Sequence, residues 1–184
     1  TGGGKSVCFQ IPSLMRDGIC IVISPLISLM KDQVEHLKSK GIKSVAITSG
    51  FSKDEVDVAL NNCMFGNYKF LYLSPERLQN KVVQERIRQM DVNLITVDEA
   101  HCISEWGYDF RPSYLHIAKI REVIPDTPIL ALTATATADI VDDIQEKLLF
   151  RERYLLQSSF VRENLSYVLI NTEKKKIKLV KILN

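Results

Sequence analysis

The sequence has few of the features that mark membrane, secreted or metal-dependent proteins. Its longest apolar run falls short of the roughly 18 residues that a membrane-spanning helix needs, and no signal-peptide pattern opens it. Only four cysteines occur in 184 residues, without a CxxC pair or metal-ligand spacing to the three histidines. We therefore expect reduced thiols that bind no metal, a reducing compartment and no contact with a membrane.

Net charge is also low. The formal net charge is +2, and residues 171–184 hold five lysines and one glutamate, which leaves −2 for residues 1–170. This distribution excludes a uniformly basic nucleic-acid-binding surface, so any such contact must come from local patches and stacking. With 46% hydrophobic and 25% charged residues, the composition is that of a globular protein with a sizeable core.

Short apolar runs alternate with longer amphipathic stretches along the chain. Near-continuously apolar strands are typical of a sheet covered on both faces, so the alternation predicts a doubly wound, mainly parallel α/β sheet. In such sheets, ligands bind outside the carboxyl ends of the strands. The predicted strands are 19–24, 44–48, 69–74, 93–98 and 128–133, and the predicted helices are 5–16, 26–40, 53–65, 79–90, 114–124 and 137–149.

The chain also predicts two parts. Residues 1–157 form one domain, whereas residues 158–184 are interpreted as a connector and the start of a second domain. The alternative is a C-terminal helix that packs on the same core. Within the first domain, Ser52 stands three residues before Glu55, which is the capping-box pattern of a helix start.

The segment "TGGGKS" at the start of the chain has the pattern of a phosphate-binding loop. Gly2, Gly3 and Gly4 would let backbone N–H groups turn toward a polyphosphate, Lys5 would neutralise its charge, and Ser6 would ligate Mg²⁺. Such a loop normally follows a buried strand, so we expect this sheet to lack its first strand. A flexible glycine-rich loop is the alternative interpretation.

A second motif, "NLITVDEAH", supplies the partner of that loop. It places Asp98 and Glu99 at the carboxyl end of a predicted strand. Asp98 would hold Mg²⁺ and Glu99 would polarise the water that attacks the γ-phosphate of ATP. A solvated turn could also contain two adjacent carboxylates, but its combination with a phosphate loop favours nucleotide hydrolysis.

The residues around this motif carry a family resemblance. The DEAH tetrapeptide (residues 98–101) resembles motif II of superfamily 2 helicases, and "CISEWGYDFRPSY" (residues 102–114) resembles the aromatic-rich loop of RecQ-family DNA helicases. The further motifs Ia, Ib and III of these helicases resemble residues 24–34, 71–78 and 132–137. This resemblance implies a RecA-like P-loop NTPase lobe of a bacterial-type, ATP-dependent 3′–5′ DNA helicase of recombination and repair, cytoplasmic and associated with the nucleoid.

The aromatic-rich loop holds the candidate single-stranded DNA contacts. Trp106, the one tryptophan of the sequence, and Phe110 could stack on unpaired bases, and Arg111 could reach a phosphate. Tyr114 is interpreted as a core residue. The resemblance implies that this loop couples DNA binding to ATP hydrolysis.

Other motifs suggest further roles. In motif Ia, Ser24, Pro25 and Ser28 lie between a strand end and a helix start, a suitable place for one DNA phosphate. Arg77 of motif Ib is a further candidate DNA contact. The residues that could couple the nucleotide and DNA sites are His101, Thr133 and Thr135.

The resemblance also implies parts beyond these motifs. A second RecA-like lobe would supply an arginine finger and the rest of the DNA track, and the expected substrate is single-stranded and partly duplex DNA. The segment "SFVRENL" (residues 159–165) resembles the family's connector, with Glu163 where proline is common. Two alternatives remain: a nucleotide-gated DNA-binding module without unwinding activity, and a related DEAH-type RNA helicase, against which the aromatic loop argues.

Overall fold

The computed structural model describes residues 4–157, 165–166 and 168–183. The chain divides into two compact units, Thr1–Arg153 and Tyr154–Asn184. The first contains the sheet, and the second contains helix α8 (Lys175–Leu183). The division lies near the predicted boundary at residue 157, and the interpretation of the second unit as the start of another lobe stays a prediction. The connector position Glu163 lies outside the described residues.

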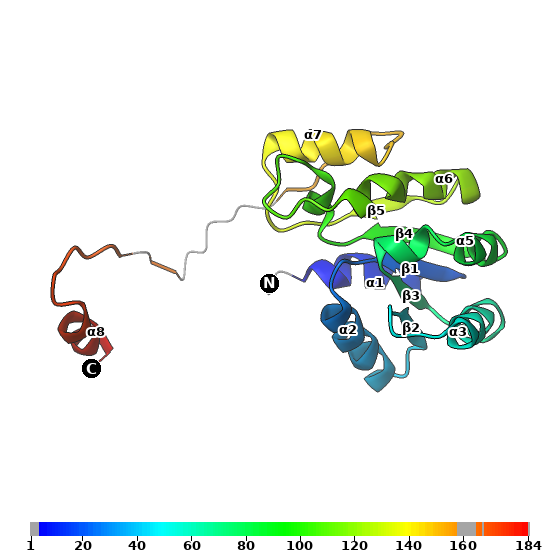
Figure 1. Ribbon diagram of the computed structural model, residues 1–184, viewed down its shortest axis with the longest axis horizontal. Helices are drawn as coiled ribbons and strands as arrows, with labels where there is room; N and C mark the ends of the chain where they lie inside the picture. Colours follow the sequence, from blue (N-terminus) through cyan, green and yellow to red (C-terminus); the bar gives the residue numbers. More distant parts are fainter. Residues whose placement is uncertain (1–3, 158–164, 167, 184) are drawn as a thin grey trace. The chain divides into compact units, whose positions relative to one another are not determined.

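Five strands form one sheet in the order β2-β3-β1-β4-β5, and each neighbouring pair is parallel. This arrangement confirms the predicted doubly wound α/β fold (Figure 1). Because the strands are parallel, their carboxyl ends share one edge of the sheet, which we call the carboxyl edge. The strands are β1 (Ile19–Ile23), β2 (Ser44–Ile47), β3 (Phe70–Leu73), β4 (Val92–Val97) and β5 (Ile129–Ala131).

Helices cover both faces of the sheet, as the apolar strands require. One face packs against α1 and α2, and the other against α3, α5, α6 and α7 (Figure 1). The helices of this unit are α1 (Lys5–Leu14), α2 (Ile27–Ser39), α3 (Lys53–Phe65), α4 (Pro75–Leu78), α5 (Lys81–Arg88), α6 (Ile120–Val123) and α7 (Ala138–Lys147), with 3₁₀ helices η1 (Ala100–Ile103) and η2 (Pro112–Lys119).

Two predicted helices differ from the observed ones. The stretch predicted at 79–90 is preceded by the short helix α4, and Ser74 and Asn80 cap α4 and α5 separately through their side chains. The helix predicted at 114–124 begins at Pro112, whose ring favours the first turn of a helix. Its first part is the 3₁₀ helix η2, which contains Tyr114, the last residue of the aromatic-rich loop.

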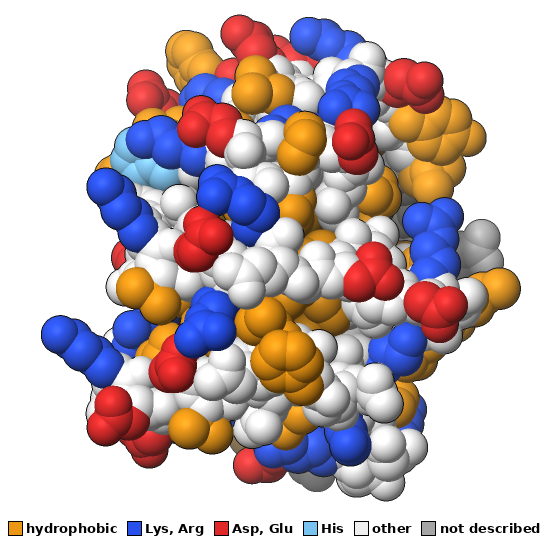
Figure 2. Space-filling view, turned by 90° about the vertical axis from the view of Figure 1, so that its right-hand side faces the viewer, with side chains coloured by type: hydrophobic (Ala, Val, Ile, Leu, Met, Phe, Trp, Pro, Cys, Tyr) orange, Lys and Arg blue, Asp and Glu red, His pale blue; other side chains and the backbone are white. Residues whose placement is uncertain are grey.

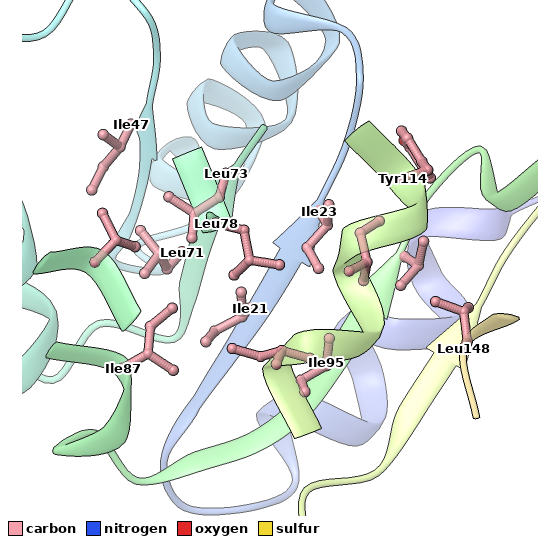
Figure 3. Close-up of a cluster of buried hydrophobic side chains, with 14 of the residues drawn as sticks. Ile21, Ile23, Ile47, Leu71, Leu73, Leu78, Ile87, Ile95, Tyr114 and Leu148 are labelled. Atoms are coloured by element: carbon pink, nitrogen blue, oxygen red, sulfur yellow. The ribbon is translucent and has the colours of Figure 1, made fainter. Parts of the chain in front are cut away.

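The central strand β1 anchors the core, since all five of its residues are buried. Ile21 and Ile23 point into the larger apolar cluster together with Leu71, Leu73 and Ile95 of the neighbouring strands (Figure 3). Cys20 and Val22 point to the opposite face, toward α1 and α2. The buried centre of the sheet therefore fixes the strand ends that carry the candidate site.

The surface shows no concentration of one charge on the side drawn in Figure 2. Basic and acidic side chains are interspersed there with apolar ones, in keeping with the low net charge of the sequence. Within the described part of the chain, the helices are too short or too polar to cross a membrane.

The capping box at α3 generates the first prediction. The Ser52 hydroxyl accepts a hydrogen bond from the Glu55 N–H, and the Glu55 carboxylate accepts one from the Ser52 N–H. Ser52→Ala should lower the free energy of unfolding by about 1 kcal/mol, as measured by urea denaturation. Ser49→Ala, at an exposed position three residues earlier, should leave it unchanged. Equal effects of the two substitutions would contradict a stabilising capping box.

Candidate active site

The first turn of α1 meets the end of β4 at the carboxyl edge. The Lys5 ammonium group lies 2.7 Å from Glu99 Oε1 and 3.8 Å from Asp98 Oδ1. Lys5 and Glu99 are each about a quarter exposed, whereas the Asp98 side chain is 7% exposed. The fold thus brings the predicted phosphate-binding lysine and both predicted catalytic carboxylates together from positions 94 residues apart.

Backbone geometry directs the two carboxylates. Glu99 adopts a left-handed conformation with φ 46° and ψ 46°, which is costly for a residue other than glycine. The Asp98 N–H extends the sheet by donating to the Ile23 carbonyl, and the Glu99 N–H donates to Asp98 Oδ1. The chain therefore turns sharply between the carboxylates.

The electrostatics of Asp98 suit a divalent cation. Burial raises the pKa of its carboxyl group, and the nearby Lys5 ammonium opposes that rise. Carboxylate and hydroxyl oxygens are the ligands that Mg²⁺ prefers, and Ser6 lies in the first turn of α1, next to Lys5. A bound cation would offset the cost of burying the Asp98 charge, so this donor set fits Mg²⁺.

The phosphate loop is described from Gly4 onward, and the predicted ligands Gly2 and Gly3 lie outside the described residues. Gly4 has φ 72°, and among the described residues other than its chain neighbours, no atom would lie within 4 Å of a Cβ atom there. The N–H groups at the start of a helix favour an anion.

His101 joins the carboxylates to the segment after β5. Its Nδ1 atom lies 2.9 Å from the Thr133 hydroxyl and 3.4 Å from Glu99 Oε2. The imidazole is buried and stacks on Tyr108, with ring centroids 5.2 Å apart. Thr133 also accepts a hydrogen bond from the N–H of exposed Thr135. The three predicted coupling residues thus form one connected group.

The aromatic-rich loop projects its tryptophan outward. Trp106 is 79% exposed, and Phe110 is partly buried. Gly107 lets the loop fold back closely, because a Cβ atom there would lie 2.9 Å from the His101 carbonyl oxygen. Ser104 fixes the start of the loop, since its hydroxyl donates to Asp143 of α7 and accepts from the Trp106 N–H. The exposed indole therefore projects from a loop whose backbone is held by these hydrogen bonds.

The end of the loop contacts the segment after β1. The Arg111 guanidinium donates to the Pro25 carbonyl and pairs with Asp109. Ser24 is buried, and among the described residues its hydroxyl has no hydrogen-bond partner. Ser28 is exposed in the first turn of α2, a helix without an N-terminal side-chain cap. These predicted DNA contacts therefore lie along one stretch of the carboxyl edge.

Arg77 occupies a different setting. Its guanidinium donates to the Thr48 and Phe51 carbonyl groups and so holds the loop between β2 and α3. This intramolecular role is not visible in the sequence motif, and the DNA contact of Arg77 stays a prediction.

Some residues of the site were not predicted from their motifs. Tyr114, interpreted only as a core residue, donates its hydroxyl to the Asp98 carbonyl at 2.9 Å. Burial raises the pKa of this phenol, which keeps the donor protonated. Tyr108 supports His101, and Asp143 holds Ser104. The sequence contains no local signal for these contacts, since each depends on how distant segments pack.

A cluster of His101, Cys102 and Asp109 resembles a metal site in its spacing, with one ligand atom of each within 4.8 Å of the others. Two features disfavour a cation there. The Arg111 guanidinium lies 3.3 Å from the Asp109 carboxylate, and burial raises the pKa of the Cys102 thiol to about 12. The expectation that the cysteines bind no metal stays a prediction.

Comparison with solved structures supports the fold. The Pyrococcus furiosus Hef helicase domain superposes with a TM-score of 0.57 at 20% identity, over 80% of this chain and 31% of that one. This likeness, with the five-stranded parallel sheet, confirms the predicted RecA-like α/β fold.

Sequence comparison identifies the family. The family model for DEAD/DEAH box helicases matches residues 1–144. The chain is 48% identical to the ATP-dependent DNA helicase RecQ of Bacillus subtilis over 95% of its length, and 43% identical to that of Haemophilus influenzae over 92%. It spans 30% and 27% of the length of these two relatives. The chain therefore belongs to the DEAD/DEAH box helicase family, and its predicted resemblance to the RecQ helicases is confirmed.

Proposed function

We propose that this chain is the first motor lobe of an ATP-dependent 3′–5′ DNA helicase. The observation that carries the proposal is the convergence of Lys5, Asp98 and Glu99 at the carboxyl edge, with the Trp106 loop following directly in the chain. The names of the curated relatives, ATP-dependent DNA helicases, support the same activity.

The roles in ATP hydrolysis follow from the charges of the site. Lys5 would bind the β- and γ-phosphates, and Ser6 and Asp98 would hold Mg²⁺, which neutralises developing phosphate charge when bound. Glu99 would then orient and polarise the attacking water. In the present geometry Glu99 is paired with Lys5 at 2.7 Å. Because phosphate oxygens compete for the same ammonium group, ATP binding would free Glu99 for this role.

The roles in DNA binding follow from the side chains of the aromatic-rich loop and of the segment after β1, along the same edge of the sheet. Trp106 and Phe110 would stack on unpaired bases, and Arg111 would reach a phosphate. The buried Ser24 hydroxyl, the Pro25 segment and the start of α2 at Ser28 would hold a further phosphate of the strand. His101, with Thr133 and Thr135, would link this surface to the γ-phosphate side.

The proposal includes a second RecA-like lobe, joined through residues 158–184, which supplies an arginine finger. Cycles of ATP binding and hydrolysis would open and close the two lobes on single-stranded DNA and separate the duplex ahead. We propose that this strand separation serves DNA recombination and repair, in the cytoplasm at the nucleoid.

An alternative is a DNA-binding module whose DNA binding is controlled by nucleotide and which does not unwind DNA. DNA-stimulated ATP hydrolysis by the two-lobe protein distinguishes the two, since a rate indifferent to single-stranded DNA would contradict the motor. For the DEAH-type RNA helicase alternative, competition between DNA and RNA for the aromatic-rich loop is decisive. Preferential displacement of DNA by RNA would favour that alternative.

Removal of the phosphate-binding lysine generates the second prediction. In the two-lobe protein, Lys5→Ala should lower kcat for ATP hydrolysis by about 10²-fold or more, because the phosphate charge loses its partner. Single-stranded DNA binding, measured by fluorescence anisotropy without nucleotide, should change little. Lys38→Ala, at an exposed position on α2, is the matched control, and retained turnover in Lys5→Ala would refute the assigned role.

Removal of the exposed indole generates the third prediction. Trp106→Ala should weaken single-stranded DNA binding by about 1–3 kcal/mol, the value of one base–aromatic stack, and should reduce DNA stimulation of ATP hydrolysis. The KM for ATP should change less, because the indole lies outside the nucleotide site. Phe65→Ala removes an aromatic side chain that is 80% exposed on α3 and should leave DNA stimulation intact. An unchanged stimulation factor in Trp106→Ala would contradict the stacking role.

A further inference from the structure

Tyr114 makes a contact with the catalytic turn that its sequence motif does not indicate. Its side chain is fully buried on η2, at the margin of the apolar cluster in Figure 3, and its hydroxyl donates to the Asp98 carbonyl at 2.9 Å. Asp98 is the residue that leaves strand β4, just before the left-handed turn at Glu99. The phenol therefore reaches the backbone of the catalytic turn from a separate element.

The peptide group between Asp98 and Glu99 is held at both of its polar atoms. Its oxygen accepts from Tyr114, and its N–H donates to Asp98 Oδ1 at 3.0 Å. Rotation of this peptide plane would release the Asp98 carboxylate and redirect Glu99 together. The hydroxyl of Tyr114 is thus bonded to the peptide group that joins the two carboxylate residues, and its hydrogen bond is to the backbone rather than to either carboxylate.

Tyr114 is the last residue of the aromatic-rich loop and is also bonded to its arginine. Its N–H donates to the Arg111 carbonyl at 2.9 Å, and the Arg111 N–H donates to the Cys102 carbonyl. The Arg111 guanidinium donates to the Pro25 carbonyl, in the segment that is proposed to hold a DNA phosphate. A shift of Arg111 toward a phosphate would therefore move the first turn of η2, which carries the phenol.

We propose that Tyr114 is a positioning residue that sets the Asp98–Glu99 peptide plane and transmits DNA binding at the aromatic-rich loop to these carboxylates. This inference rests on the proposed helicase function. It adds a connection through η2 to the one through His101, and it concerns a residue that the motifs mark only as core.

The test compares Tyr114→Phe with Tyr72→Phe in the two-lobe protein. Tyr72 is equally buried, and its hydroxyl donates to Gln33 Oε1 at 3.0 Å on the opposite face of the sheet. Each variant loses one buried hydroxyl and keeps its ring, so loss of stability alone should affect both alike. Activity is measured per folded protein, well below the Tm of each variant.

Tyr114→Phe should lower kcat for DNA-stimulated ATP hydrolysis and raise the half-activating Mg²⁺ concentration, with the larger effect about 10-fold or more, as for other residues that orient a metal ligand. Its KM for ATP should stay within about threefold, because Lys5 and the loop glycines are untouched. In hydrogen exchange, residues 98–103 should exchange faster than in wild type. Tyr72→Phe should show none of these changes.

Equal kcat values and Mg²⁺ dependence in the two variants would overturn the inference and leave Tyr114 a structural residue. If Tyr114→Phe does not fold, exchange in the wild-type protein decides. Single-stranded DNA should then change the exchange rate of residues 98–103, and Trp106→Ala should abolish that change; an unchanged rate overturns the inference. A wild-type protein whose ATP hydrolysis is indifferent to DNA would instead refute the proposed function.

Discussion

The site depends on the ion pair between Lys5 and Glu99. The two residues are 94 positions apart, and only the parallel sheet brings the start of α1 and the end of β4 to within 2.7 Å. Burial makes the neighbouring Asp98 carboxylate costly to ionise, so the charges of the site are balanced among the lysine, the carboxylates and, in the proposed working state, Mg²⁺ and phosphate. In the proposed function, ATP hydrolysis would begin with the exchange of these partners.

Around this centre, side-chain contacts join the proposed nucleotide side to the proposed DNA side. The aromatic-rich loop is fixed to α7 through Ser104 and Asp143 and to the segment after β1 through Arg111. His101 and Tyr114 then connect the loop to the turn at Glu99 from two directions. The exposed Trp106 lies in this same loop. A nucleobase stacked on it would therefore contact a segment that is bonded to the turn of the carboxylates.

The sequence predicts the sheet and the convergence of Lys5, Asp98 and Glu99 because both depend on local patterns. Apolar strands alternating with amphipathic helices determine a parallel sheet, and parallel strands place Asp98 beside the phosphate loop. The Tyr114 and Arg77 contacts could not be predicted in this way. The hydroxyl of a buried tyrosine needs an acceptor, but the sequence does not say which one. The acceptors of Tyr114 and Arg77 are backbone carbonyls, which have no residue signature.

When ATP binds, we expect Lys5 to exchange Glu99 for phosphate. A crystal structure of the protein with Mg²⁺ and a non-hydrolysable ATP analogue would reveal this exchange. We expect the Lys5 ammonium to lie on the β- and γ-phosphate oxygens, Glu99 to face the γ-phosphate, and Asp98 to face the metal while its carbonyl stays bonded to Tyr114. A bound analogue with Lys5 still paired to Glu99 at its present distance would refute the exchange.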